Sequence, residues 1–172
     1  MARQIRLGLI GLLLGLLFWL GGGSLALPVA AVILQQTEAP GQVLYQSRQT
    51  LTDRSAQGWQ AIAFKRIRSE GESILTLRLV GFPGVTDVQH PHPLALVTSL
   101  GQRYQAPDIT DQVFGASDPE GNVGQYDLHE ILPVLKPEIP LQLFLQASDG
   151  TTVVIPIPGR VMREWQKVAA RS

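Results

Sequence analysis

The chain has 172 residues with 14 basic and 14 acidic side chains, so its formal net charge is zero when its histidines are neutral. It contains no cysteine. This absence excludes disulfides, thiolate catalysis and lipid attachment through a thiol, so burial and hydrogen bonding must stabilise the fold.

The first 31 residues have the pattern of a secretory signal peptide. Arg3 and Arg6 precede an unbroken apolar run over 7–20, and small residues follow between 24 and 31. A cationic start, an apolar segment of this length and a small-residue exit are typical of cleaved export signals. We therefore predict a signal peptide over 1–31 and a single exported β-rich domain over 32–172.

An uncleaved membrane anchor is the alternative for this segment. Apolar residues resume over 25–34, so the stretch from 7 to 34 exceeds the ~20 residues that span a bilayer. Cleavage is preferred because the glycines at 21–23 are poor helix formers. Cleavage leaves 12 basic residues against 14 acidic ones, a net charge of −2 that disfavours nucleic-acid binding.

The region 32–172 is predicted to be mainly β. Leu75, Leu77 and Leu79 alternate with Thr76 and Arg78, which is the clearest pattern of a strand with one buried face. Polar turns separate the other candidate strands, and closely spaced strands of this kind favour an antiparallel β-sandwich or barrel-like domain. These other candidates are 41–51, 59–67, 94–99, 103–106, 141–146 and 151–157.

Two helices complete the predicted fold. A short one near 128–135, which contains Pro133, follows a loop that proline and glycine mark over 119–124. At the C-terminus, apolar residues that include Trp165 recur with the helical period, and basic residues lie on the opposite side. We expect this amphipathic helix to dock its Trp165 side on a sheet, with peripheral contact with an anionic membrane as the alternative.

Charge is unevenly distributed along the chain. The segment 48–78 holds six basic and three acidic residues, whereas 87–149 holds two basic and nine acidic ones. Such regions either steer docking onto a charged partner or face each other in the fold. The sequence predicts a partner-binding surface at Lys65, Arg66 and Arg68, together with Phe82. The side chain of Phe82 fits either an exposed docking point or a core position.

Metal binding and catalysis have weaker support in the sequence. His90 and His92, each followed by proline, could share a copper or zinc ion, but no third ligand stands at a known spacing and a rigid loop is the preferred interpretation. The chain has neither a G-x-S-x-G elbow nor a glycine-rich phosphate loop. No enzymatic activity and no cofactor are therefore predicted.

Five segments of the sequence form a distinctive set: 38–42 (EAPGQ), 45–51 (YQSRQTL), 59–60 (WQ), 77–84 (LRLVGFPG) and 122–128 (NVGQYDL). Together they resemble a family of exported cyanobacterial proteins that is catalogued only as a domain of unknown function. The resemblance covers nearly all of 32–172. It implies a photosynthetic bacterial source and a periplasmic or thylakoid-lumen location, and it implies no activity, cofactor or catalytic residue.

These observations predict an exported, non-catalytic binding or assembly factor. Its partner would be a protein at a membrane complex, at the periplasmic or thylakoid-lumen face of a photosynthetic bacterial membrane. A metal or small-ligand binding protein that uses His90 and His92 is the alternative, and an uncharacterised hydrolase is the second alternative.

Overall fold

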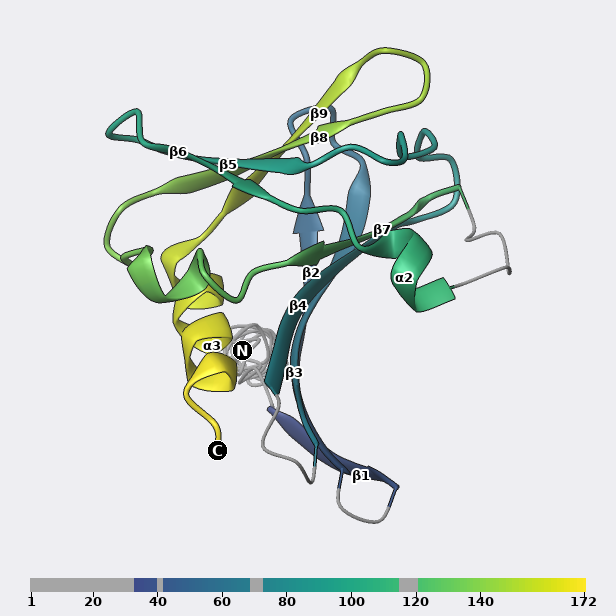
Figure 1. The fold of residues 1–172 in the computed structure, drawn as a ribbon. Coiled ribbons are helices and arrows are strands. Elements are labelled where there is room, and N and C mark those ends of the chain that lie inside the picture. Colours follow the sequence, from purple (N-terminus) through teal and green to yellow (C-terminus); the bar gives the residue numbers. More distant parts are fainter. Residues whose placement is uncertain (1–32, 40–41, 69–72, 115–120) are drawn as a thin grey trace, which may run out of the picture. The chain divides into compact units, whose positions relative to one another are not determined.

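The computed structural model describes residues 33–39, 42–68, 73–114 and 121–172 (Figure 1). The predicted signal peptide over 1–31 lies outside these residues. The described segments belong to one compact unit, Ala31–Ser172. Among them, no helix combines the length and the apolar character that crossing a bilayer requires.

Two antiparallel sheets form the described part of the chain, and they do not close into a barrel. The predicted mainly β fold is therefore confirmed in its two-sheet form. One sheet has the order β1 (Leu34–Ala39), β2 (Gln42–Thr52), β3 (Gly58–Ile67), β4 (Ser73–Gly81), β7 (Val123–Asp127). The other has the order β6 (Arg103–Ala106), β5 (Leu94–Thr98), β8 (Leu141–Gln146), β9 (Thr152–Ile157).

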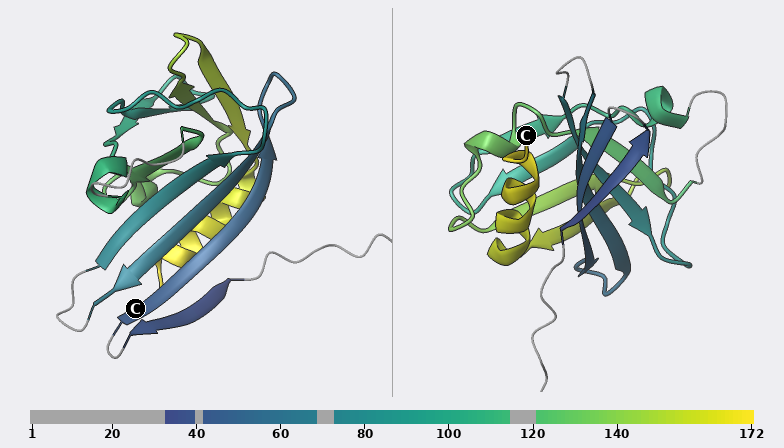
Figure 2. Two further views of the ribbon diagram at one scale, coloured as in Figure 1. Left: turned by 90° about the vertical axis from the view of Figure 1, so that its right-hand side faces the viewer. Right: turned by 90° about the horizontal axis from the view of Figure 1, so that it is seen from below.

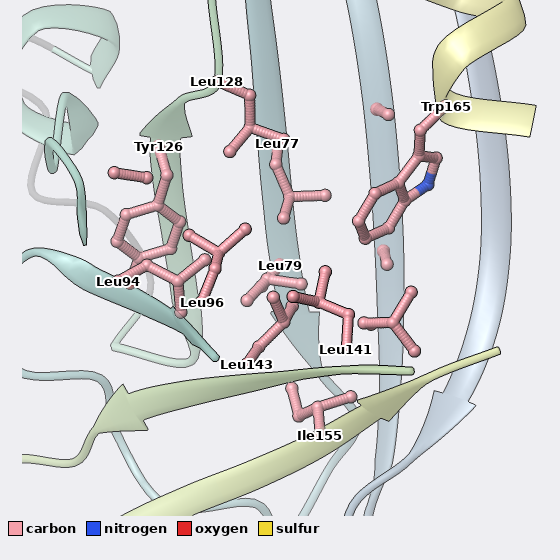
Figure 3. Close-up of a cluster of buried hydrophobic side chains, with 14 of the residues drawn as sticks. Leu77, Leu79, Leu94, Leu96, Tyr126, Leu128, Leu141, Leu143, Ile155 and Trp165 are labelled. Atoms are coloured by element: carbon pink, nitrogen blue, oxygen red, sulfur yellow. The ribbon is translucent and has the colours of Figure 1, made fainter. Parts of the chain in front are cut away.

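The hydrophobic core lies between the two sheets. Leu77 and Leu79 of β4 are fully buried, as the alternating pattern predicts, because successive side chains of a strand point to opposite faces. Figure 3 shows them facing leucines of the second sheet such as Leu143, with Trp165 beside them. Burying a side chain of this size stabilises the fold by about 1.5–3 kcal/mol.

The C-terminal helix α3 (Gly159–Ala169) covers part of the inner face of the five-stranded sheet (Figures 1 and 2). It begins after Pro158, a position where the missing N–H of proline is tolerated. Its apolar side, which includes the fully buried Trp165, packs against β2 and β3. The predicted docking is confirmed, so only the basic side of α3 remains available for contact with a membrane.

The short helix predicted near 128–135 is present as a 3-10 helix, η1 (Leu132–Val134), with Leu132 buried. Three other elements differ from the sequence prediction. β1 and the helix α2 (Thr110–Phe114) were not predicted. β7 replaces the end of the loop predicted over 119–124. Gly124 pairs with Leu79 of β4, and glycine fits there because a Cβ would lie 2.5 Å from the hydroxyl oxygen of Tyr126.

Candidate functional site

The outer face of the five-stranded sheet is the side opposite α3. Figure 1 shows this sheet nearly edge-on and bowed, with α2 and β1 flanking the hollow side of the bow. Figure 2 shows β2, β3 and β4 in front of α3 when the molecule is viewed from this side. Because side chains alternate along a strand, the odd-numbered residues of β3, such as Trp59, point to the core, and the even-numbered ones point to the outer face.

Strand register arranges the outer side chains in rows that cross the strands, and three adjacent rows include or flank Phe64. Phe64 of β3 lies in the middle row and is only 8% exposed, so neighbouring side chains cover most of its ring. The rows are Arg48, Ile62, Arg78 and Gln125, then Gln46, Phe64, Thr76 and Asp127, then Leu44, Arg66 and Ile74.

Two arginines lie over the ring of Phe64. The Cζ atom of Arg78 is 5.6 Å from the ring centroid, and that of Arg66 is 6.0 Å from it. These distances are within the range of cation–π attraction. Nε of Arg78 also donates a hydrogen bond of 2.9 Å to Oε1 of Gln125. We call Phe64 with Arg48, Arg66 and Arg78 the arginine cluster.

Like charges are held close together in this cluster. Partial burial, and then the nearby charge of Arg66, lower the pKa of Arg78 below its ordinary value. Both effects disfavour the charged guanidinium, although arginine stays protonated at neutral pH. Arg66 and Arg78 have further interactions within the chain, so an incoming anion would add to those contacts or replace them.

The surface is hollowed on both sides of Phe64. A hollow of about 260 Å³ lies over β1, β2 and β3 and is lined by Arg48, Arg66 and Arg78. A second hollow of about 460 Å³ extends towards β7 and α2. Phe64 and Arg66 line both hollows, so the two meet at the arginine cluster.

One family of sequences matches nearly the whole described unit. This family is described as "Protein of unknown function (DUF3122)", and the match spans residues 31–168. The chain belongs to DUF3122. Neither the curated proteins nor the solved structures contain a match to it.

The structure separates the predicted partner-binding residues of this DUF3122 chain. Arg66 lies on the outer face, and the exposed Arg68 lines the 460 Å³ hollow. Lys65 points to the inner side, where its Nζ donates hydrogen bonds to the carbonyl oxygens of Ala169 (2.9 Å) and Arg171 (2.6 Å). Lys65 therefore holds the C-terminal end of α3, where a cation complements the helix dipole.

Phe82 lies far from these arginines. Its backbone N–H donates to the carbonyl oxygen of Gly58, at the start of β3, with an N–O distance of 3.0 Å. Arg66 is eight residues further along the same strand, which corresponds to roughly 26 Å. Phe82 is 39% exposed, but it does not share a surface patch with Arg66.

Sequence reasoning missed Phe64, Arg48 and Arg78 as members of the site. A signal for Arg78 was present, because it alternates with the buried leucines of β4 and so must face outward. The register between β2 and β3, which places Arg48 opposite Ile62, was not available from periodicity.

The histidines of the DUF3122 chain occupy a structural position. Nδ1 of His90 lies 2.7 Å from Oδ2 of Asp108, and Nε2 lies 2.9 Å from the carbonyl oxygen of Val123. Nδ1 of His92 faces the carbonyl oxygen of Pro93 at 3.1 Å. A metal ion at His90 would have to displace one of these contacts, and the described residues hold no group of three potential metal ligands.

A further hollow of about 510 Å³ collects polar groups at the edge of the sheet. Ser73, Asp127, His129 and Glu130 line it. In the described part of the chain, no hydrogen bond joins the His129 ring to Ser73 or to a carboxylate. Ser73 and His129 therefore line the same hollow without a hydrogen bond between them in the described part of the chain.

Proposed function

We propose that this DUF3122 protein is an exported, non-catalytic binding or assembly factor that docks an acidic segment of a protein partner on its arginine cluster. Its place of action would be the periplasmic or thylakoid-lumen face of a photosynthetic bacterial membrane, at a membrane complex. The pattern of residues 1–31 supports export, and the resemblance of the five sequence segments supports the compartment.

The placement of Arg66 and Arg78 over one ring carries the proposal. Two guanidinium groups lie over the ring of Phe64, and guanidinium groups bind carboxylates through paired hydrogen bonds. A bound carboxylate would also reduce the repulsion between the two cations. The hollows on either side of Phe64 give such a segment room to lie along the face.

Affinity purification with cross-linking from native membranes tests this proposal. The variant to compare with the wild type is Arg66→Gln/Arg78→Gln. The matched control is Arg103→Gln, because Arg103 also lies over a phenylalanine ring, at 5.9 Å from the centroid of Phe144 on the other sheet. Arg48→Gln is a second variant of the arginine cluster, at an exposed position. Thermal unfolding shows which variants remain folded.

We expect the wild type and Arg103→Gln to recover the same partner. Arg66→Gln/Arg78→Gln should recover it about tenfold less efficiently, because two charge-assisted contacts are lost. Arg48→Gln should reduce recovery less, and added salt should weaken binding of the wild type. Equal recovery by all folded variants, or no specific partner for the wild type, would overturn the proposal.

A further inference from the structure

The hollows of the outer face continue into the edge hollow. The 460 Å³ hollow shares Phe64 and Arg66 with the hollow over β1–β3, and it shares Ile74 and Asp127 with the 510 Å³ hollow. The three hollows therefore adjoin one another across β2, β3, β4 and β7. We call them together the outer groove.

Charge changes sign along the outer groove. Among the described residues, the end over β1–β3 is lined by arginines and by no carboxylate. The edge hollow is lined by Asp127 and Glu130 and, in the same part of the chain, by no lysine or arginine. The middle hollow holds Arg66 and Asp127 together. A partner that fills the groove therefore meets a positive pole and then a negative one.

Strand register gives the distance between the poles. Phe64 pairs with Thr76, and Thr76 pairs with Asp127, so Phe64 and Asp127 lie in one row, two strands apart. At about 4.8 Å per strand this separation is about 10 Å. An extended peptide advances about 3.3 Å per residue, so the same span corresponds to three residues.

We infer that the outer groove binds an extended protein segment in which an acidic side chain at the arginine cluster is followed, three residues away, by a basic side chain at Asp127. This inference rests on the proposed function and specifies the partner. The segment crosses the strands rather than extending the sheet, so its side chains and their charges supply the recognition.

Labelled peptides test the inference with the full-length protein in detergent at low salt. The first probe is a peptide of Gly, Ser and Thr with a Glu-Glu pair and a Lys three positions after it. The second probe has Gln in place of this Lys, and the third has Lys directly after the pair. Dissociation constants come from fluorescence anisotropy.

We expect the first probe to bind about two- to fivefold more tightly than the second and the third, which is the range for one partly exposed ion pair. In Asp127→Asn this advantage should disappear, whereas binding of the second probe should stay unchanged. In the wild type, the backbone N–H of His129 donates a hydrogen bond of 2.8 Å to Oδ1 of Asp127. Asparagine keeps a side-chain oxygen that can accept this bond. Arg103→Gln should leave all three affinities unchanged.

The inference of two charged poles and the proposed function fail in different ways. If the three probes bind equally, and Arg66→Gln/Arg78→Gln weakens all of them, the two-pole inference is wrong and the arginine cluster remains a binding site for anions. If Arg66→Gln/Arg78→Gln changes no affinity, or if no probe binds, both the inference and the proposed function are overturned.

Discussion

Asp108 makes the densest set of polar contacts outside the arginine cluster. Its Oδ1 accepts hydrogen bonds from the backbone N–H and the hydroxyl of Thr110, and its Oδ2 accepts from the backbone N–H of His92 and contacts Nδ1 of His90. The ring of His90 also contacts β7, because its Nε2 lies 2.9 Å from the carbonyl oxygen of Val123. Asp108 therefore links the His90 loop, α2 and β7.

The stability of the fold should depend on pH through the carboxylate of Asp108. Desolvation acts to raise the pKa of Asp108, but hydrogen bonds from Thr110, His92 and His90 outweigh it and hold the pKa below its ordinary value. A folded-state pKa below the unfolded value of about 3.9 stabilises the fold above pH ~4, and this contribution is lost as the pH falls through the folded-state pKa.

We expect Asp108→Asn to lower the free energy of unfolding at pH 7 by about 1–3 kcal/mol, measured with urea. The difference from the wild type should shrink below pH ~4. Asp111→Asn is the control, because Asp111 is an exposed aspartate on the neighbouring helix α2. A difference that stays constant from pH 7 to pH 3 would contradict the role of the charged carboxylate.

At the scale of elements, α3 depends on β3 for more than apolar contact. Lys65 donates hydrogen bonds to two carbonyl oxygens at the end of the helix, where no further turn supplies backbone N–H groups as donors. Those two bonds join the last residues of the chain to the inner side of the sheet.

Lys65→Met keeps the aliphatic chain of Lys65 and removes its charge. We expect a loss of about 1–2 kcal/mol in the free energy of unfolding and faster amide hydrogen exchange in the last turn of α3. Lys167→Met is the control, since Lys167 pairs with Glu164 of the same helix at 2.7 Å. If exchange in the last turn is equal in the two variants, Lys65 does not hold this end.

Periodicity predicted the elements that bury one face, and it failed where pairing is distant in sequence. Leu77 and Leu79 show the period of two, and α3 shows the helical period, so both were predictable. The pairing of β4 with β7 brings Arg78 beside Gln125 across 47 residues, and no local pattern encodes it. The placement of Lys65 and Arg66 on opposite faces, in contrast, follows from a local rule, because neighbours in a strand point to opposite sides.

Across the whole described unit, the two faces of the five-stranded sheet have different roles. The inner face contributes to the core beneath α3 and the second sheet, and the outer face carries a small apolar cluster of Leu44, Ile62 and Phe64 with arginines above it. The exposed side of α3 is also basic, with residues such as Arg163. It is the competing candidate for an acidic partner.

Site-specific photo-cross-linking in native membranes distinguishes the two surfaces most directly. A benzophenone side chain replaces Gln46, which pairs with Phe64 on the outer face, or Arg163 on the exposed side of α3. We expect one specific partner adduct from position 46, lost in Arg66→Gln/Arg78→Gln and retained in Arg103→Gln, and no such adduct from position 163. An adduct from position 163 with none from position 46 would contradict the assignment of the outer face as the binding surface.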